Sequence, residues 1–385
     1  MANTENPDAF KHLFDRAGVA RIADLLGAAS DAFDRDAFLA HVLPTIESLE
    51  MKARVALITD GLHAALPLPF PDAVAALLQI LGPPGAPSGT DAWGPASEDG
   101  LSSLAAWPVT RFVAEHGLEH PEVALDALEE MTRRFTAEFA LRPFLLRYPE
   151  LTLARLRTWV QSPDQHLRRA ASEGTRPRLP WGIRLKPFIA DPEPVLALIA
   201  PLRADPEDYV QRSVGNNLND IGKDHPDRLL EIAAEWQDPA SPATGKILRR
   251  ALRSLVKEGV PDALRLMGYT VPAAVVIEDP ALRLEHLTLG QTQELTYTLV
   301  STAEAPQRLL IDYVLHLVRA RGKTGEKVFK GRPLTLAPGE RRAMVFKLPL
   351  KAVTTRRYYS GAHRLQLQVC GERRDALAFH LEVPP

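Results

Sequence analysis

The chain has 385 residues, of which 45% are hydrophobic and 24% are charged. This composition is typical of a globular protein and excludes a mainly disordered chain. The length predicts two or three domains. No apolar run reaches the roughly 18 residues that a membrane span needs, and the first residues show no signal-peptide pattern. A single cysteine, Cys370, excludes an internal disulfide framework and a cysteine-based zinc finger, so we expect a cytoplasmic protein.

The net charge of −2 conceals a strongly uneven distribution along the chain. Residues 1–130 carry a net charge of −13, residues 131–190 carry +8, and residues 271–385 carry +6. A basic region on a neutral protein is a candidate surface for phosphate groups. The alternative is an ordinary solvated helix face, which is the more frequent role of a block of charge.

From about residue 8 to residue 268 the sequence has the pattern of amphipathic helices. Apolar residues recur three and four positions apart, as in ALDALEEMTRRFTAEFALRPFLL. Breaks that pair proline with an acidic residue recur between these segments, and they suit helix N-termini. The implied helix pairs of roughly 35–45 residues have the period of HEAT-type repeats. A segment rich in Gly and Pro, at about 78–106, predicts a long loop or insertion.

After about Tyr269 the pattern changes to a period of two, with β-branched and aromatic residues between turn signals. Seven or eight short strands in this part predict a sandwich of immunoglobulin size. We therefore predict a mainly α protein. Residues 1–268 form a HEAT-like helical-repeat solenoid, and residues 272–385 form a C-terminal all-β immunoglobulin-like sandwich.

Common cofactor and catalytic motifs are missing from the sequence. It contains no P-loop, no GxGxxG after a strand, no GxSxG and no HExxH, and its histidines lack metal-ligand spacing. We expect no cofactor and no metal. One block does attract attention, because Glu173 lies among arginines and close to Trp181. The alternative is that Glu173 is merely neutralised by its arginine neighbours at a repeat turn.

Three segments in order carry a resemblance to a known family. They are TAEFALRPFLLRYP (136–149), WVQSPDQHLRRAASEGTRPRLPWGIRLKPF (159–188) and SVGNNLNDIGKDHPD (213–227). Together they resemble the AlkC family of HEAT-like repeat DNA alkylation-repair glycosylases, most strongly over about 105–260. Some members of that family carry an immunoglobulin-like domain after the repeats, which matches the strand-rich end of this chain.

The resemblance implies that Glu138, Glu173 and Asp220 are the catalytic carboxylates. It places Trp181 beside the lesion and Arg169 near the phosphates. Independently, the three acids are 35 and 47 residues apart, about one helix pair each, so equivalent positions project from one face of a solenoid.

Each of these residues also has a purely structural alternative. Glu138 lies four residues from both Arg134 and Arg142 and has the spacing of a helix ion pair. Asp220 has the sequence context of a turn at a helix C-terminus, and Trp181 that of an aromatic packed between repeats.

Basic residues are expected to hold the DNA backbone without reading its sequence. In the sandwich the alternative is that they are ordinary charged hairpin tips. The predicted DNA-binding residues are Arg168, Arg169, Arg176, Arg178, Arg184, Lys186, Lys323, Lys327, Arg356 and Arg357.

The resemblance implies a monofunctional glycosylase that removes cationic alkylated bases, 3-methyladenine and 3-methylcytosine, from double-stranded DNA in base excision repair. Carboxylates stabilise the cationic base and the oxocarbenium-like sugar, and we assign water activation to Glu173. Because no lysine is expected among the acids, no Schiff base should form. We expect a monomer without an obligate protein partner. The alternative is a non-catalytic helical-repeat scaffold that binds DNA or protein through its concave face.

Overall fold

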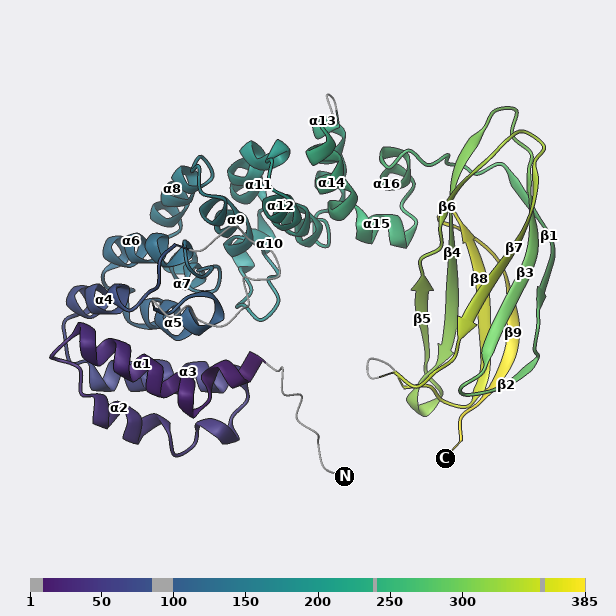
Figure 1. Cartoon of the computed structure of the whole chain (residues 1–385). Helices are drawn as coiled ribbons and strands as arrows, with labels where there is room; N and C mark the ends of the chain where they lie inside the picture. The colour runs from purple at the N-terminus through teal and green to yellow at the C-terminus, as the bar shows by residue number, and fades with distance from the viewer. Residues whose placement is uncertain (1–9, 85–99, 238–240, 354–356, 385) are drawn as a thin grey trace. The chain divides into compact units, whose positions relative to one another are not determined.

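The computed structural model describes residues 10–84, 100–237, 241–353 and 357–384 (Figure 1). The chain divides into two compact units, each described here by itself. The first comprises the chain up to Leu229 together with residues 241–251. The second comprises Leu230–Gln237 and the chain from Leu252 onward. Helices give way to strands between Leu266 and Val275. The last two helices belong to the same compact unit as the strands. The predicted domain limits at 268 and 272 stay a prediction.

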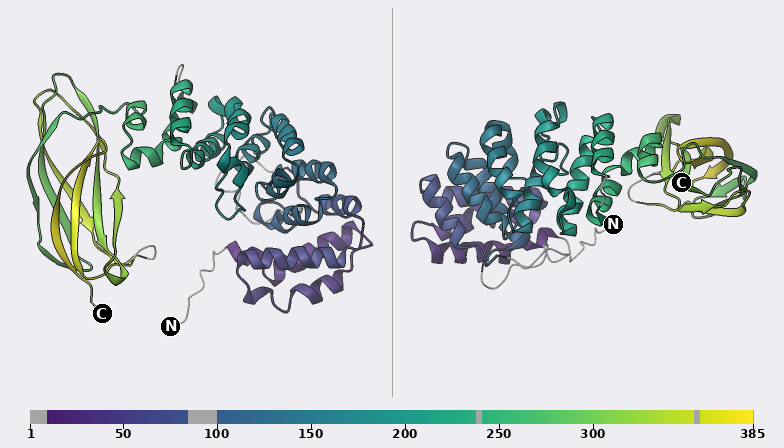
Figure 2. Two further views of the ribbon diagram at one scale, coloured as in Figure 1. Left: turned by 180° about the vertical axis from the view of Figure 1, so that it is seen from behind. Right: turned by 90° about the horizontal axis from the view of Figure 1, so that it is seen from above.

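Helices follow one another along the chain up to Leu266, and those of the first unit lie side by side in chain order (Figures 1 and 2). The α-helices are α1 (Arg16–Ala29), α2 (Arg35–Val42), α3 (Met51–Ala65), α4 (Phe70–Gln79), α5 (Trp107–His116), α6 (Pro121–Thr132), α7 (Leu141–Arg147), α8 (Pro149–Trp159), α9 (Gln165–Gly174), α10 (Lys186–Ala190), α11 (Glu193–Ile199), α12 (Asp208–Ile221), α13 (Pro226–Trp236), α14 (Pro242–Ala251), α15 (Arg253–Glu258) and α16 (Pro261–Leu266). The predicted long loop falls between α4 and α5, and its residues 85–99 lie outside the described residues.

The predicted proline and aspartate signals begin several of these helices. Pro149 and Pro226 open α8 and α13, where their missing N–H groups cost nothing. The Asp164 carboxylate caps α9 by accepting the backbone N–H of His166. This cap fixes the start of α9 and therefore the position of Glu173 at its other end.

Gly215 allows α12 and α14 to pack closely. A Cβ atom at residue 215 would lie 2.7 Å from Cβ of Arg250 and 3.0 Å from the carbonyl oxygen of Ile247. The approach also lets the Asn219 amide donate to the carbonyl of Ala251 at 2.8 Å. The last turn of α12, which carries Asp220, is thus held on the side that faces α14.

The second unit contains a β-sandwich. Its strands are β1 (Val275–Leu282), β2 (His286–Thr288), β3 (Thr292–Ser301), β4 (Gln307–Val318), β5 (Thr324–Phe329), β6 (Pro333–Leu336), β7 (Arg341–Pro349), β8 (Gly361–Val369) and β9 (Glu372–Glu382). One sheet has the order β1-β3-β7, and the other has the order β2-β9-β8-β4-β5 with β6 beside β4. All pairs are antiparallel except β2 with β9. The prediction of a helical solenoid followed by an immunoglobulin-like sandwich is confirmed. Strands β2, β5 and β6 are added to the expected ones, and Lys327 lies on β5 and not in a turn.

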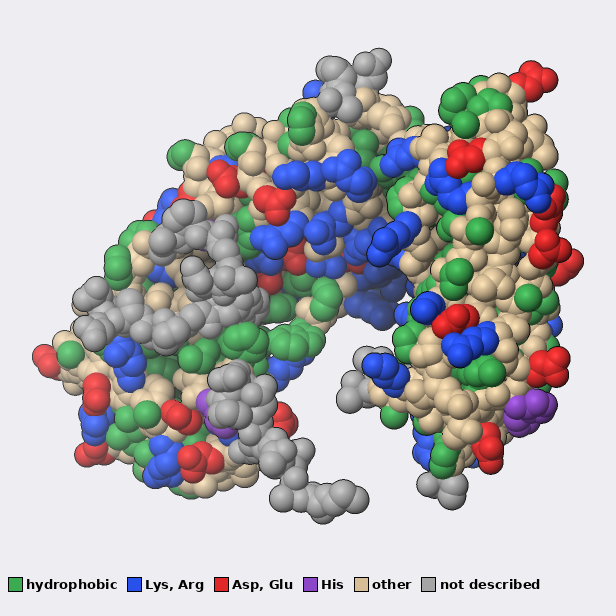
Figure 3. Space-filling model, turned by 45° about the vertical axis from the view of Figure 1, so that its right-hand side comes forward, with side chains coloured by type: hydrophobic (Ala, Val, Ile, Leu, Met, Phe, Trp, Pro, Cys, Tyr) green, Lys and Arg blue, Asp and Glu red, His purple; other side chains and the backbone are tan. Residues whose placement is uncertain are grey.

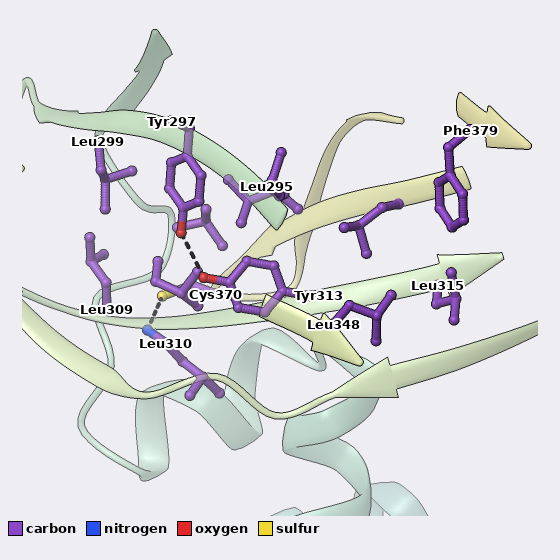
Figure 4. Close-up of a cluster of buried hydrophobic side chains, with 14 of the residues drawn as sticks. Leu295, Tyr297, Leu299, Leu309, Leu310, Tyr313, Leu315, Leu348, Cys370 and Phe379 are labelled. Atoms are coloured by element: carbon purple, nitrogen blue, oxygen red, sulfur yellow. Dashed lines mark hydrogen bonds between the residues drawn. The ribbon is translucent and has the colours of Figure 1, made fainter. Parts of the chain in front are cut away.

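Leucine and aromatic side chains from both sheets fill the core of the sandwich (Figure 4). At its centre the hydroxyl groups of Tyr297 and Tyr313 hydrogen-bond to each other at 2.9 Å. Cys370 is buried there, and its sulfur accepts the backbone N–H of Leu310. A thiol enclosed in this way is a packing group and has no access to solvent.

Within the described residues, no single helix has the length and apolar composition to cross a membrane. Helices α3 and α4 pass that test only as a pair, and they are bent by 119° at their junction.

Candidate active site

The three predicted catalytic carboxylates lie at the ends of repeat helices. Glu138 precedes α7, and Glu173 and Asp220 are the last but one residues of α9 and α12. All three side chains are buried. The C-terminus of a helix carries partial negative charge, so an acid there is disfavoured unless cations surround it. Glu173 and Asp220 therefore both require nearby basic partners.

Those partners are present, and acidic and basic side chains alternate in one continuous row. The row, called the charge ladder below, consists of Glu138, Arg169, Glu173, Arg176, Asp220 and Lys223. At its first end, the Arg169 guanidinium donates to Glu138 and lies 3.7 Å from Oε1 of Glu173. Arg169 also lies over the ring of Tyr209, 5.1 Å from its centroid. One guanidinium thus joins two acids that are 35 residues apart.

Arg176 continues the ladder from Glu173 to Asp220. Its Nη1 donates to Oε1 of Glu173 at 2.6 Å, and its Nε donates to Oδ2 of Asp220 at 2.8 Å. The ammonium group of Lys223 closes the row at 2.7 Å from Oδ1 of Asp220. The ladder therefore contains three acids and three bases and has no net charge when all are ionised.

Hydroxyl groups fix two of the carboxylates further. Ser213 on α12 donates to Oε2 of Glu173 at 2.6 Å, and Thr136 donates to Glu138. Each oxygen of Glu173 therefore has its own donor, Arg176 on one side and Ser213 on the other. A carboxylate held in this way is preorganised, because it needs no reorientation when a positive charge develops nearby.

The surroundings separate the pKa values of the two glutamates. Burial raises the pKa of Glu138 and prevails over the opposing effects of Arg169 and Thr136, while the charge of Glu173 adds to the rise. Burial acts in the same direction on Glu173, but Arg169, Arg176 and Ser213 together outweigh it, so the pKa of Glu173 is lowered. Glu173 thus stays ionised, whereas Glu138 has the greater proton affinity.

Trp181 is the aromatic side chain that this site presents to solvent. Its side chain is 63% exposed, and its backbone has a φ of +67°. The ring stacks parallel to Trp107 with a centroid distance of 6.4 Å, and Trp107 in turn stacks on Phe139. Lys52 of α3 donates to the Trp181 carbonyl at 3.0 Å. Trp181 thus stacks against Trp107, and the Lys52 ammonium lies over its ring, 5.6 Å from the centroid.

The structural alternatives for these residues fare differently. Glu138 does not pair with Arg134 or Arg142, because Arg134 pairs with Glu130 and Arg142 donates to backbone carbonyls. Asp220 does lie in the C-terminal turn of α12, where its carbonyl accepts the N–H of Lys223, and its side chain is in addition buried and ion-paired with Arg176. Trp181 is not a core aromatic.

The alternative for Glu173 does hold, because arginines at positions 169 and 176 neutralise it. Such neutralisation is compatible with a role in chemistry, because neither arginine is bound to Glu173 alone. Arg169 also pairs with Glu138, and Arg176 also pairs with Asp220.

The predicted DNA-binding residues of the first unit separate into three groups. Arg168 is bound by Asp205 and Arg178 by Asp224, each through two hydrogen bonds. Arg169 and Arg176 belong to the ladder. Arg184 and Lys186 are exposed, and Lys and Arg side chains gather on the hollowed face of the helical unit (Figure 3).

The expectation that Arg176 lies on a DNA-facing surface needs correction, because its side chain is buried between two carboxylates. A planar guanidinium satisfies two carboxylates as well as it does a phosphate, and the acids are already within the fold. In the second unit Lys323, Lys327 and Arg357 are exposed. The predicted Arg356 lies outside the described residues.

Several residues of the site were not anticipated. Ser213, Tyr209 and Lys52 reach it from other repeats, and no local pattern marks them. Lys223 had a signal in its spacing of three from Asp220. The prediction that no lysine lies among the acids is therefore wrong.

No group of three or more His, Cys, Asp or Glu side chains that would hold a metal ion exists in the described part of the chain. The carboxylates of the ladder use their oxygens on arginine, lysine and hydroxyl donors instead.

Comparison with known proteins places these features in a family. A family model described as DNA alkylation repair enzyme matches residues 109–255. A second, described as the C-terminal Ig-like domain of the uncharacterised protein YhaZ, matches residues 276–383. YhaZ of Bacillus subtilis is 32% identical over 372 residues, which are 96% of this chain and 99% of that protein.

A solved structure is similar over the same extent. The Pseudomonas fluorescens alkylpurine DNA glycosylase AlkC, bound to DNA containing an abasic site analog, is 36% identical with a TM-score of 0.86. The match covers 97% of this chain and 99% of that one. The chain belongs to the AlkC family of DNA alkylation repair enzymes. The predicted family is therefore confirmed, while the roles of individual site residues in this AlkC relative stay predictions.

Proposed function

We propose that the protein is a monofunctional DNA glycosylase that hydrolyses the N-glycosidic bond of cationic alkylated bases in double-stranded DNA. The observation that carries this proposal is the buried, fixed and ionised Glu173 at the centre of the charge ladder. Family membership supports it, because the AlkC of Pseudomonas fluorescens is an alkylpurine DNA glycosylase. We propose 3-methyladenine and 3-methylcytosine as the bases removed, as the first step of base excision repair.

The chemistry of such bases suits carboxylates. Alkylation at N3 places a positive charge on the ring, which makes the base a good leaving group. As the bond from C1′ to the base nitrogen breaks, its electrons go to the base and the sugar becomes oxocarbenium-like. A water oxygen then bonds to C1′ and loses a proton. Fixed anions stabilise the transition state when they interact more strongly with the developing sugar cation than with the ground state.

The two glutamates take different parts in this scheme. Glu173 has a lowered pKa, which makes it a weak base but a permanent negative charge, so we assign it to the sugar cation. Glu138 has a raised pKa and the proton affinity expected of a general base, so we assign it to the attacking water. This reverses the assignment made from sequence, where Glu173 activated the water.

In this proposal Arg169 connects the ladder to the DNA. Its side chain is 15% exposed and lies between Glu138 and Glu173, so a phosphate that binds it removes a counter-ion from both acids. Arg176 stays buried between Glu173 and Asp220 and takes no part in DNA contact.

A lysine near the acids could form a Schiff base with the abasic sugar, so the presence of Lys223 in the ladder requires a direct test of the monofunctional assignment. Its amine is ion-paired with Asp220 and its side chain is 45% exposed. A lysine nucleophile is usually activated by desolvation or by a neighbouring cation, and not by a bound carboxylate. We therefore expect no covalent adduct when borohydride is added during the reaction.

The decisive experiment is to incubate the purified protein with methylated duplex DNA and identify the released bases by mass spectrometry. We expect 3-methyladenine and 3-methylcytosine to be released, with the abasic strand left uncut. A duplex containing hypoxanthine is the matched neutral lesion and should remain intact. Binding of the DNA without release of any base would instead identify a repeat scaffold.

A second prediction concerns the exposed cations. Replacing Arg184 and Lys186 together by alanine should reduce the slope of log K against log salt by about 1.8, because each phosphate contact contributes about 0.9. The measurement is fluorescence anisotropy of a labelled duplex at several KCl concentrations. Arg168→Ala is the control, since Asp205 already binds that side chain. Equal slopes for the wild type and the double variant would show that Arg184 and Lys186 do not contact DNA phosphates.

A further inference from the structure

Arg142 is the buried cation that the proposed chemistry does not use. Its side chain has no exposed surface. Its Nη1 donates to the carbonyl oxygens of Gly174 and Arg176, both at 2.9 Å, and its Nε donates to the carbonyl oxygen of Ile183 at 2.6 Å. Burial, followed by repulsion from Arg176, lowers the pKa of Arg142 to about 10, which still leaves it charged at neutral pH.

The three carbonyl groups belong to the two ends of one irregular segment. Residues 175–185 connect α9 to α10 without helix or strand, and they carry Arg176 and Trp181. Within the segment, Leu185 donates to the carbonyl of Pro177 at 3.2 Å. Arg142 therefore binds carbonyl groups near both the start and the end of this segment.

The bond to Ile183 is adjacent to a strained residue. Trp181 has a φ of +67°, and a side chain other than glycine in that region costs on the order of 1–3 kcal/mol unless its surroundings fix it. Lys52 holds the Trp181 carbonyl from one side. On the other side Gly182 lies against Arg142, where a Cβ atom would be 3.1 Å from Nε.

We infer that Arg142 is a positioning residue that sets the exposed ring of Trp181 for the DNA. The inference rests on the proposed function, in which Trp181 stacks beside the lesion. Arg142 touches neither the reacting atoms nor the carboxylates of the ladder. Its bond to the Ile183 carbonyl fixes the backbone next to Gly182. That backbone in turn sets the direction in which the Trp181 indole points.

Arg142→Lys isolates this contribution. The lysine side chain places a methylene where Nε stood and an ammonium near the guanidinium carbon. The variant keeps a cation beside the carbonyls of Gly174 and Arg176 but loses the donor to Ile183. We expect kcat/KM for base release to fall by about 10- to 100-fold, since a displacement of 1 Å in a positioning element can cost about 10²-fold.

Arg54 supplies a matched control. It is also buried and donates only to carbonyl oxygens, with Nε at 2.7 Å from Leu49 and other donors on Phe14, Lys11 and Glu47. Arg54→Lys removes the same kind of bond at a residue whose hydrogen bonds involve neither the ladder nor residues 175–185. It should shift thermal stability as much as Arg142→Lys while leaving kcat/KM within about twofold.

Two measurements separate positioning from plain destabilisation. In a double-mutant cycle, Arg142→Lys should lower kcat/KM by less than about threefold once Trp181→Ala is present. Without DNA, acrylamide quenching of the Trp181 fluorescence, obtained by difference from Trp181→Phe, should change at least twofold in Arg142→Lys. Unchanged quenching together with additive losses in the cycle would overturn the inference. The quenching result does not depend on catalysis, so failure of the glycosylase assignment would be recognised separately.

Discussion

Replacing Glu173 by glutamine is expected to lower the single-turnover rate constant for base release by about 10²- to 10³-fold, the range found when one preorganised group that stabilises developing charge is removed. Glutamine has nearly the same shape but no negative charge. It leaves Arg169 and Arg176 facing a neutral amide, so the site would carry a positive charge where the proposed mechanism needs a negative one. The loss should be similar at every pH, because Glu173 has a lowered pKa and is ionised throughout the working range.

Loss of a buried charge partner also lowers stability, by about 3–5 kcal/mol in comparable cases, so rates must be compared well below the unfolding temperature. Glu173→Asp keeps the charge and should retain more activity than the glutamine variant. Glu193→Gln is the control, because that glutamate forms an exposed ion pair with Arg228 in the same unit. A rate for Glu173→Gln within threefold of wild type would remove this residue from the mechanism.

Replacing Glu138 by glutamine is expected to abolish the acidic limb of the pH–rate profile and to lower the rate at neutral pH by about 10²-fold, the lower range for loss of a general base. A base must be deprotonated to accept a proton, so the wild-type rate falls as the pH drops through the pKa of Glu138. Burial raises that pKa above the ordinary 4.5. The limb should therefore lie above pH 4.5, and it should disappear in the variant.

The measurement is single-turnover release between pH 4.5 and 8, corrected for spontaneous loss of the base from the same DNA. Glu173→Gln run in parallel should be slow but should retain the limb. If the limb instead persists in Glu138→Gln and disappears in Glu173→Gln, the assignment made from sequence is the correct one.

Much of the architecture follows from local pattern. The period of the apolar residues, the proline and aspartate signals and the change to alternation after Tyr269 are properties of neighbouring residues, and each predicted the element that forms there. Repeat spacing gave a physical reason for the three acids to share one face, and the structure joins them through common arginines.

What the sequence did not reveal is which anion each arginine binds. Carboxylate and phosphate attract the same guanidinium group, and the choice depends on distances between repeats that no local pattern encodes. Arg142 illustrates the point, because its spacing from Glu138 suggests a helix ion pair while the fold directs it to the carbonyls of Gly174, the last residue of α9, and of Ile183. Ser213 begins one of the segments that carry the family resemblance, but nothing in the sequence marks it as a partner of Glu173, which lies 40 residues away.

The alternation of the charge ladder also determines what DNA encounters at a distance. Adjacent opposite charges cancel as the separation grows, and at physiological salt little of their field extends beyond the Debye length of about 8 Å. If Arg184 and Lys186 bind the DNA backbone as proposed, these exposed cations guide an approaching duplex, and the buried acids do not repel it. In the proposed mechanism the negative charge of the ladder acids acts only on a nucleotide in contact with them, and not on DNA that is still at a distance. For the same reason, a variant that neutralises one ladder acid should hold undamaged DNA more tightly, and so spend longer at each intact site.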